Sequence, residues 1–470
     1  MSLELTRRSL LASAGASVAA AQQGGKPNVL FFFPDQVRAC ETGYNGGKNI
    51  PTPNIDRFAG QGMNFTNALS TCPLCTPYRA MLQTGRWPTL SGGVMNWINM
   101  VQTGQALGDV FTRGGYETGF IGKWHLAAGA RAGTLKRGEP TRQQAEPEFV
   151  PPGPARMGYQ YWAAFNFHAN FSKAFYYRDT SQRLMMPKYE TDSETDFAID
   201  FLRNRTPASK PFFLVVAPHP PHPPWRPEQT PAASLERTPR SLYWRPNVKG
   251  RRDAATVDPR CYFAMLGNVD DNFGRLMKYL DESGLAENTI VVFTSDHGEM
   301  MASHSRYNKM VPYGEAVDVP LLVRWPKHIR AGSKSDAMFT PLDHLPTLAS
   351  MCGLEIPSLA NGMDLSGHLF GRKGAREHDA ALMMNYVSHW DYPETNTEWP
   401  EWRGIRTKQY TYCRWLNGAE ELYDNAADPY QFRNLWDGRR APDVMARMRK
   451  RLADLLHDSH DDFPPGTKYA

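Results

Sequence analysis

Short runs of apolar residues, each bounded by turn-forming residues, recur along the chain. They lie at residues 29–33, 118–121, 212–216, 289–294 and 321–323. Runs without polar alternation are typical of strands buried on both faces, and such strands form parallel sheets that helices cover. The pattern therefore predicts an α/β fold.

Apolar residues at helical spacing predict a long helix from Tyr262 to Glu282, which Gly284 ends. The stretches 128–154 and 218–246 are rich in Pro, Arg and Gly and are predicted to be long surface loops. Long loops in a compact enzyme often shape the substrate site.

The C-terminal part has a different pattern. A boundary is expected near residues 371–374, after which residues 404–412 alternate as an antiparallel strand does. An amphipathic helix from Asp443 to His457 follows. The pattern predicts a main domain, residues 22–372, and a small sheet-plus-helix subdomain, residues 373–470.

The first residues are typical of an export signal. Arg7 and Arg8 precede a weakly apolar run that ends in the small residues 19–21. The run is too short to span a bilayer, so residues 1–21 are predicted to be a signal peptide. The arginine pair resembles a twin-arginine signal, and an ordinary secretory signal is the alternative. Both predict a bacterial protein that is exported to the periplasm or medium, without a membrane span.

Charge and cysteine content exclude some classes. The chain has 53 Lys and Arg against 48 Asp and Glu, which is too small and dispersed an excess to indicate nucleic-acid binding. It fits an anionic substrate but equally serves solubility. The six cysteines have neither metal-finger spacing nor the density of a disulfide framework. Cys72 and Cys75 form a CxxC pair, which leaves a thioredoxin-like redox motif open.

Polar side chains follow four of the apolar runs. They are Asp35 and Gln36, Lys123 and His125, His219 and His222, and Asp296 and His297. Ligands bind beyond the carboxyl ends of strands in open parallel sheets. A single Asp there is usually a helix cap and a single His is usually structural, but four such strand ends together indicate an active site.

The acidic residues of this set are candidate metal ligands. Asp35, Asp296 and the carbonyl group of Gln36 are hard oxygen ligands that suit Ca²⁺, with Mg²⁺ or Mn²⁺ as alternatives. His297 is a softer ligand, which places it either at the metal or at a bound anion.

Cys75 is predicted to lie at the N-terminus of a helix. Pro77 suits the first turn and Gly85 ends the helix. Free N–H groups and the helix dipole favour an anion at this end, and Arg79 can reach the same point from one turn along. An average cysteine would instead be a small buried hydrophobe.

The sequence around Cys75 resembles the signature of the sulfatase family. Cys75-Thr-Pro-Tyr-Arg79 matches the family's C-x-P-x-R pattern, and residues 82–86 match its continuation. Further segments agree in order along the chain, at 27–35, 114–126, 221–224, 294–299, 308–320 and 421–435.

The sequence departs from the common family pattern at three positions. Tyr78 replaces a usual serine, Gln36 a usual Asp, and His297 an Asn that several members have. The last two are similar to a bacterial branch that includes choline sulfatases and phosphonate monoester hydrolases.

The resemblance implies an alkaline phosphatase-like fold. This is a large mixed, mostly parallel sheet sandwiched by helices, with a small C-terminal antiparallel sheet-plus-helix subdomain. It also implies hydrolysis of sulfate esters, with a sulfated glycan or polysaccharide as the leading substrate class. A formylglycine-generating enzyme would be the partner that oxidises Cys75 to formylglycine. Oligomeric state is not readable from the sequence.

The resemblance further implies roles for individual residues. Asp35, Gln36, Cys75, Asp296 and His297 would hold the metal, near which a hydroxyl of hydrated formylglycine attacks sulfur. Other residues would then act on the sulfate and on protons: Arg79, Lys123 and Lys309 neutralise the sulfate, His222 or Lys309 protonates the leaving alcohol, and His125 accepts the proton of the second hydroxyl. Asn96 and His304 are candidate substrate contacts, with ordinary loop polarity as the alternative.

Two other functions remain open. A phosphonate or phosphate ester hydrolase would use the same nucleophile and metal. A secreted binding protein that had lost catalysis would keep the fold, but the nucleophile, both lysines and the metal candidates are all present.

Overall fold

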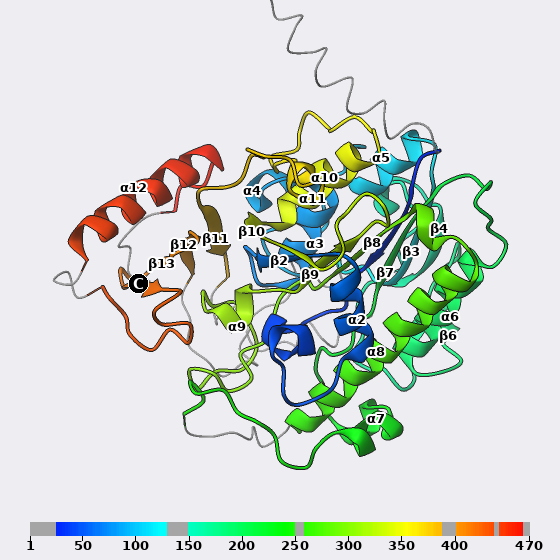
Figure 1. Cartoon of the computed structure of the whole chain (residues 1–470), viewed down its shortest axis with the longest axis horizontal. Helices are drawn as coiled ribbons and strands as arrows, with labels where there is room; N and C mark the ends of the chain where they lie inside the picture. Colours follow the sequence, from blue (N-terminus) through cyan, green and yellow to red (C-terminus); the bar gives the residue numbers. More distant parts are fainter. Residues whose placement is uncertain (1–24, 129–148, 250–257, 388–400, 437–440, 464–470) are drawn as a thin grey trace, which may run out of the picture.

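The computed structural model describes residues 25–128, 149–249, 258–387, 401–436 and 441–463 (Figure 1). The predicted signal peptide, residues 1–21, and most of the predicted loop at 128–154 lie outside these ranges. Among the described residues, no helix combines the length and apolar character needed to cross a membrane.

Eight strands of the described chain form the main sheet, in the order β10–β2–β9–β8–β1–β7–β3–β4. Strand β9 is antiparallel to β8 and β2, and the other adjacent pairs are parallel. The bounds are β1 Asn28–Phe32, β2 Met63–Ala68, β3 Glu117–Lys123, β4 Tyr161–Phe165, β7 Phe212–Ala217, β8 Thr289–Thr294, β9 Leu321–Arg324 and β10 Ser333–Phe339. The mixed, mostly parallel sheet is therefore confirmed, and every predicted apolar strand is present.

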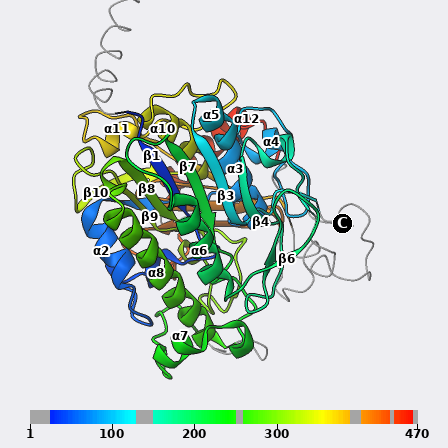
Figure 2. The same cartoon turned by 90° about the vertical axis from the view of Figure 1, so that its right-hand side faces the viewer.

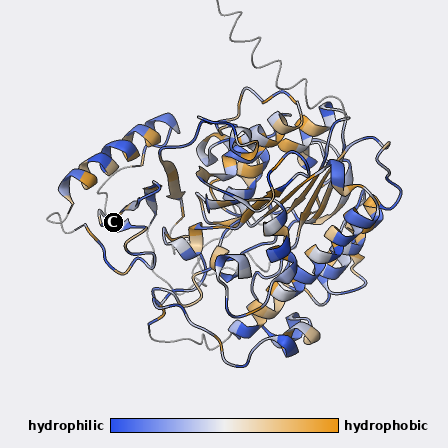
Figure 3. Ribbon diagram, viewed as in Figure 1, coloured by the Kyte–Doolittle hydropathy of each residue, from blue (hydrophilic) through white to orange (hydrophobic). Residues whose placement is uncertain are grey.

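Both faces of the sheet are buried, as the unbroken apolar runs indicate. In β1, Val29 and Phe31 face one hydrophobic cluster, whereas Leu30 and Phe32 face the other. Figure 3 shows the central strands as a largely hydrophobic part of the ribbon, between helices in which hydrophobic and hydrophilic residues are mixed.

Helices cover each face of the sheet (Figure 2). Helices α3, α5, α10 and α11 contribute to one cluster, and α2, α6 and α8 contribute to the other. The bounds are α2 Pro53–Gln61, α3 Cys75–Thr84, α5 Leu107–Arg113, α6 Glu190–Leu202, α8 Pro259–Glu282, α10 His344–Met351 and α11 Ser366–Leu369. Shorter helices are α4 Pro88–Ser91, α7 Ala232–Arg237 and α9 Gly314–Val317. A two-stranded sheet consists of β5 Phe175–Tyr176 and β6 Leu184–Met185.

The helix predicted from Tyr262 to Glu282 is α8, which begins earlier, at Pro259. The side chain of Asp258 accepts the N–H of Arg260 and caps this helix. The prediction of a long surface loop over 218–246 is wrong at residues 232–237, because α7 lies there and packs against α8. Its sequence, Ala-Ala-Ser-Leu-Glu-Arg, favours helix despite the surrounding prolines.

A second, antiparallel sheet follows the main sheet, with strand order β11–β12–β13–β14. The strands are β11 Ala381–Asn385, β12 Trp402–Arg406, β13 Tyr410–Trp415 and β14 Glu420–Asp424, and helix α12 Pro442–Asp458 packs on them (Figure 1). The single strand predicted over 404–412 is wrong: the segment spans β12 and β13. Thr407 makes the turn between them, since its N–H donates to the carbonyl of Tyr410 and its Oγ1 accepts the N–H of the same residue.

Candidate active site

Four adjacent parallel strands, β8, β1, β7 and β3, deliver the polar residues that follow them to one edge of the sheet. Helix α3 directs its N-terminus at the same edge. As predicted, Cys75 is the first residue of α3 and Gly85, with a φ of 62°, caps its end. The left-handed conformation of this cap explains the need for glycine.

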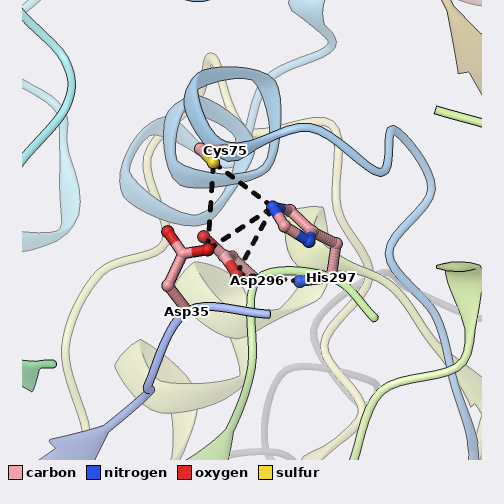
Figure 4. Close-up of side chains that lie close together, drawn as sticks. All are labelled: Asp35, Cys75, Asp296 and His297. Carbon is pink, nitrogen blue, oxygen red and sulfur yellow. Dashed lines mark hydrogen bonds and ion pairs between the residues drawn. The ribbon is translucent and has the colours of Figure 1, made fainter. Parts of the chain in front are cut away.

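Asp35, Cys75, Asp296 and His297 form a fully buried cluster, and one potential ligand atom of each lies within 4.8 Å of the others (Figure 4). Nε2 of His297 is 3.3 Å from Sγ of Cys75 and 3.7 Å from Oδ1 of both Asp35 and Asp296. Nδ1 of His297 lies 3.0 Å from the carbonyl oxygen of Gly298, which can only accept, so Nδ1 carries the proton. The lone pair on Nε2 therefore faces the cluster.

Two buried cations bind the outer oxygens of the same carboxylates. Lys123 Nζ lies 2.5 Å from Oδ2 of Asp35 and donates to Sγ of Cys75 at 3.5 Å. Arg79 Nη2 donates to Oδ2 of Asp35 at 3.1 Å and to Oδ2 of Asp296 at 3.0 Å. The Oδ1 atoms are thereby left towards His297 and Cys75.

The cluster shifts its own protonation equilibria. Burial alone would raise the pKa of Asp35, but Lys123, His222, His297 and Arg79 outweigh it and hold this pKa well below its usual range. Burial and the neighbouring Asp35 charge raise the pKa of Asp296 to about 6. Burial lowers the pKa of His297 to about 4, which keeps the imidazole neutral near pH 7. Two carboxylates, a neutral imidazole and the position of Cys75 Sγ fit a divalent cation.

Gln36 and Lys309 meet beside this cluster. The Oε1 atom of Gln36 accepts from Lys309 Nζ at 2.6 Å, and its Nε2 donates to Glu299 Oε2 at 2.5 Å. The backbone N–H of Gln36 donates to Oδ1 of Asp296 at 3.0 Å. Sequence reasoning missed Glu299, although its position two residues after His297 could have suggested a role at this strand end.

The histidines of the neighbouring strand ends are neutral; His125 is buried and His222 is partly buried. Burial, Lys123 and Arg79 lower the pKa of His125 well below its usual value, and neither of its ring nitrogens has a hydrogen-bond partner among the residues that the structure describes. Burial, Lys309 and Lys123 likewise lower the pKa of His222. Nδ1 of His222 lies 2.7 Å from the carbonyl oxygen of Pro223, so it carries the proton and leaves the Nε2 lone pair free.

The two candidate substrate contacts have different surroundings. Asn96 Oδ1 accepts the N–H of Thr76 at 2.9 Å, which satisfies a free donor at the start of α3. His304 stacks on Tyr313, with ring centroids 4.3 Å apart, and its backbone N–H donates to Asn247. Asn96 therefore supports the helix that carries Cys75, whereas His304 packs in the loop beyond Glu299.

A second buried group of His168, Glu190 and His219 lies beside the site. Oε1 of Glu190 accepts the backbone N–H of His219 at 3.2 Å. Nδ1 of His168 accepts the N–H of Asn170, so the proton of the neutral ring is on Nε2, 3.3 Å from Oε2 of Glu190. This polar cluster lies beside His219, whose ring centroid is 4.6 Å from that of His222.

Comparisons with known proteins agree with this geometry. The family model described as Sulfatase matches residues 27–354, and that of the C-terminal part of N-sulphoglucosamine sulphohydrolase matches residues 302–458. An ulvan-active sulfatase of Formosa agariphila is 33% identical over 92% of this chain and 82% of its own length. An endo-4-O-sulfatase of Bacteroides thetaiotaomicron is 30% identical over 88% of this chain and 89% of its own length.

Solved structures agree as well. A 4S-sulfatase structure connected with glycosaminoglycan metabolism by B. thetaiotaomicron has a TM-score of 0.84 at 29% identity, and covers 93% of this chain and 97% of its own. The phosphonate monoester hydrolase of Agrobacterium radiobacter, with a TM-score of 0.71 at 21% identity and 92% and 96% coverage, shares the fold. The alkaline phosphatase-like fold is confirmed. The chain therefore belongs to the sulfatase family and is a sulfuric ester hydrolase.

Proposed function

We propose that this enzyme hydrolyses the sulfate esters of sulfated glycans. The observation that carries the proposal is the buried cluster of Asp35, Cys75, Asp296 and His297, with Arg79 and Lys123 beside Cys75. Two relatives that are 30% or more identical to this chain are an ulvan-active sulfatase and an endo-4-O-sulfatase, and both names support a glycan substrate.

Asp35, Asp296, Gln36 and His297 would hold a calcium ion, together with formylglycine made from Cys75. Calcium is favoured over Mg²⁺ or Mn²⁺ because most of these ligands are oxygens and calcium accepts flexible geometry. The ion would lower the pKa of a hydroxyl of hydrated formylglycine and orient it for attack on sulfur.

The cations of the chain bind and orient the sulfate. The side chains of Arg79 and Lys123 lie near Cys75, at the N-terminus of α3. Arg79 contacts the carboxylates of Asp35 and Asp296, and Lys123 contacts that of Asp35. Lys309 donates a hydrogen bond to Oε1 of Gln36. Pre-placed positive charges in a buried site stabilise negative charge that develops on the sulfate oxygens.

Proton transfer divides between Lys309 and the histidines. The neutral His222, with its lone pair free at Nε2, suits a hydrogen-bond acceptor, so Lys309 is the better donor to the leaving alcohol. His125 is neutral, and within the described part of the chain both of its ring nitrogens are unpartnered, which suits the base that accepts the proton of the second hydroxyl.

Processing and location complete the proposal. Residues 1–21 would be a twin-arginine-type signal peptide, residues 22–372 the catalytic domain and residues 373–470 the C-terminal subdomain. Export to the periplasm or medium fits an enzyme that acts on large glycans, and a formylglycine-generating enzyme would mature Cys75.

The proposed substrate class can be tested directly. Protein made in a host with the maturing enzyme should release sulfate from sulfated polysaccharides, measured by ion chromatography. It should also cleave an aryl sulfate with a higher kcat/KM than the matching aryl phosphonate. A preference for the phosphonate would instead favour the related phosphonate hydrolase activity, which Gln36 and His297 leave chemically possible.

Calcium binding should weaken as the pH is lowered through about 6. The ion competes with the proton on Asp296, so its affinity should fall about tenfold per pH unit below that pKa. Isothermal titration calorimetry between pH 5 and 8 measures this. Asp296→Asn should remove the binding, whereas Asp270→Asn should not, although burial likewise raises the pKa of Asp270 to about 6. Equal calcium affinity at pH 5 and pH 8 would contradict the assignment of Asp296 as a calcium ligand.

Cys75→Ser should stop turnover after one chemical step. A serine sulfate ester has no second hydroxyl with which to expel sulfate, so steady-state activity should fall by at least about 10³-fold. Intact-protein mass spectrometry should show a sulfated enzyme. Cys72→Ser is the matched control, a buried free cysteine three residues away that should leave turnover unchanged. Loss of activity in Cys72→Ser alone would instead support the redox interpretation of the CxxC pair.

A further inference from the structure

We propose that Glu299 is a positioning residue that fixes the orientation of the Gln36 amide and, through it, the ammonium group of Lys309. The inference rests on the proposed function in one respect, the role of the Gln36 carbonyl group at the cation site. The contacts themselves involve only residues of this chain.

The hydrogen-bond chemistry of the two partners allows one amide orientation. The ammonium group of Lys309 can only donate, so it needs the carbonyl oxygen Oε1 of Gln36, 2.6 Å away. The carboxylate of Glu299 accepts, and it takes the amide nitrogen Nε2 of Gln36 at 2.5 Å. Glu299 and Lys309 therefore act on opposite ends of one amide, and both select the same arrangement.

Glu299 is itself held rigidly. It is fully buried, and its Oε1 accepts the backbone N–H groups of Met301 at 3.0 Å and Asn308 at 2.7 Å. These two bonds occupy one carboxylate oxygen and leave the other, Oε2, for Gln36. The carboxylate cannot turn without losing backbone hydrogen bonds in a buried place, which is costly.

The same carboxylate joins both ends of the loop before Lys309. Asn308 immediately precedes Lys309, and several non-glycine residues of this loop have left-handed φ values, namely Met301, Ala302, His304, Ser305 and Asn308. Such conformations persist only where the surroundings hold them. Glu299 is thus an anchor for the loop as well as for the amide.

The backbone of Gln36 is held in place, so only its side-chain amide can turn. Its N–H donates to Oδ1 of Asp296 at 3.0 Å and its φ is 71°. Without Glu299, the amide can rotate and present its NH₂ group to Lys309 and to the cation site. That end repels positive charge, so both cation binding and the position of Lys309 depend on Glu299.

The test is the isosteric change Glu299→Gln. Its remaining oxygen should keep the two backbone N–H bonds, so its new NH₂ group faces Gln36 and reverses that amide. Calcium affinity, measured by calorimetry, should fall about 10- to 100-fold, as for other residues that orient metal ligands. In crystals grown without metal, Lys309 Nζ should leave Oε1 of Gln36.

A charge swap distinguishes a loss of the orientation of the residue 36 side chain from general damage to the site. In Gln36→Glu combined with Glu299→Gln, the carboxylate at position 36 accepts from Lys309 and from the new amide at position 299, and it offers an oxygen to the cation. This double variant should recover most of the lost affinity, and Lys309 should return to its place. Gln36→Glu alone should not bind calcium with the wild-type affinity, because it places the carboxylate of residue 36 against that of Glu299.

The matched control is Glu315→Gln, a buried glutamate that binds Arg245 and Asn247. It should keep wild-type calcium affinity. Unchanged affinity and an unmoved Lys309 in Glu299→Gln, or failure of the swap to recover either, would overturn the proposal. If wild-type protein binds no calcium, the metal assignment is what fails, and the position of Lys309 in metal-free crystals still decides the role of Glu299.

Discussion

The structure of the active site depends on two buried carboxylates, Asp35 and Asp296, that share the buried Arg79, while the buried Lys123 pairs with Asp35. Like charges this close cannot both ionise in a protein interior unless positive groups compensate them. Arg79 and Lys123 do so at the Oδ2 atoms, and a divalent cation would do so at the Oδ1 atoms. Removing one partner of such a buried set typically costs about 3–5 kcal/mol, so the charged groups stabilise the site only together.

The fold makes this arrangement possible because adjacent parallel strands end at one edge. Strands β1 and β8 are neighbours and bring the two carboxylates together, while β3 brings Lys123 and α3 brings Cys75 and Arg79. The N–H groups at the start of α3 face the same point, and Asn96 satisfies one of them. The residues proposed to bind the anion, to hold the cation and to supply the nucleophile therefore come from β1, β8, β3 and α3, which the sheet brings together.

Much of this could be predicted from the sequence, for identifiable reasons. Strands β1, β3, β7, β8 and β9 are apolar on both faces, so unbroken runs indicated them. Strands β2 and β10 are more polar, since β2 contains Asn64 and Asn67 and β10 begins Ser-Lys-Ser-Asp, and no apolar run marked them. The hairpin of β12 and β13 was mistaken for one strand because its turn at Thr407 interrupts the alternation only briefly.

The site likewise contains residues that the sequence predicts and residues that it does not. Residues directly after strands were found because topology places them, and Cys75 was found through its helix. The orientation of Gln36 could not be found, because it depends on a left-handed backbone at a non-glycine residue and on the side chains of Glu299 and Lys309, far away in the sequence. The support that Asn96 gives to α3 depends likewise on how a loop folds back.

We propose that Cys75 becomes the nucleophile, and peptide mass spectrometry across Cys75 to Arg79 is the test. The protein should be produced in a host that contains the maturing enzyme, with a known sulfatase as the maturation control. We expect an aldehyde in place of the thiol. An intact thiol in this peptide, beside a fully matured control, would contradict the claim.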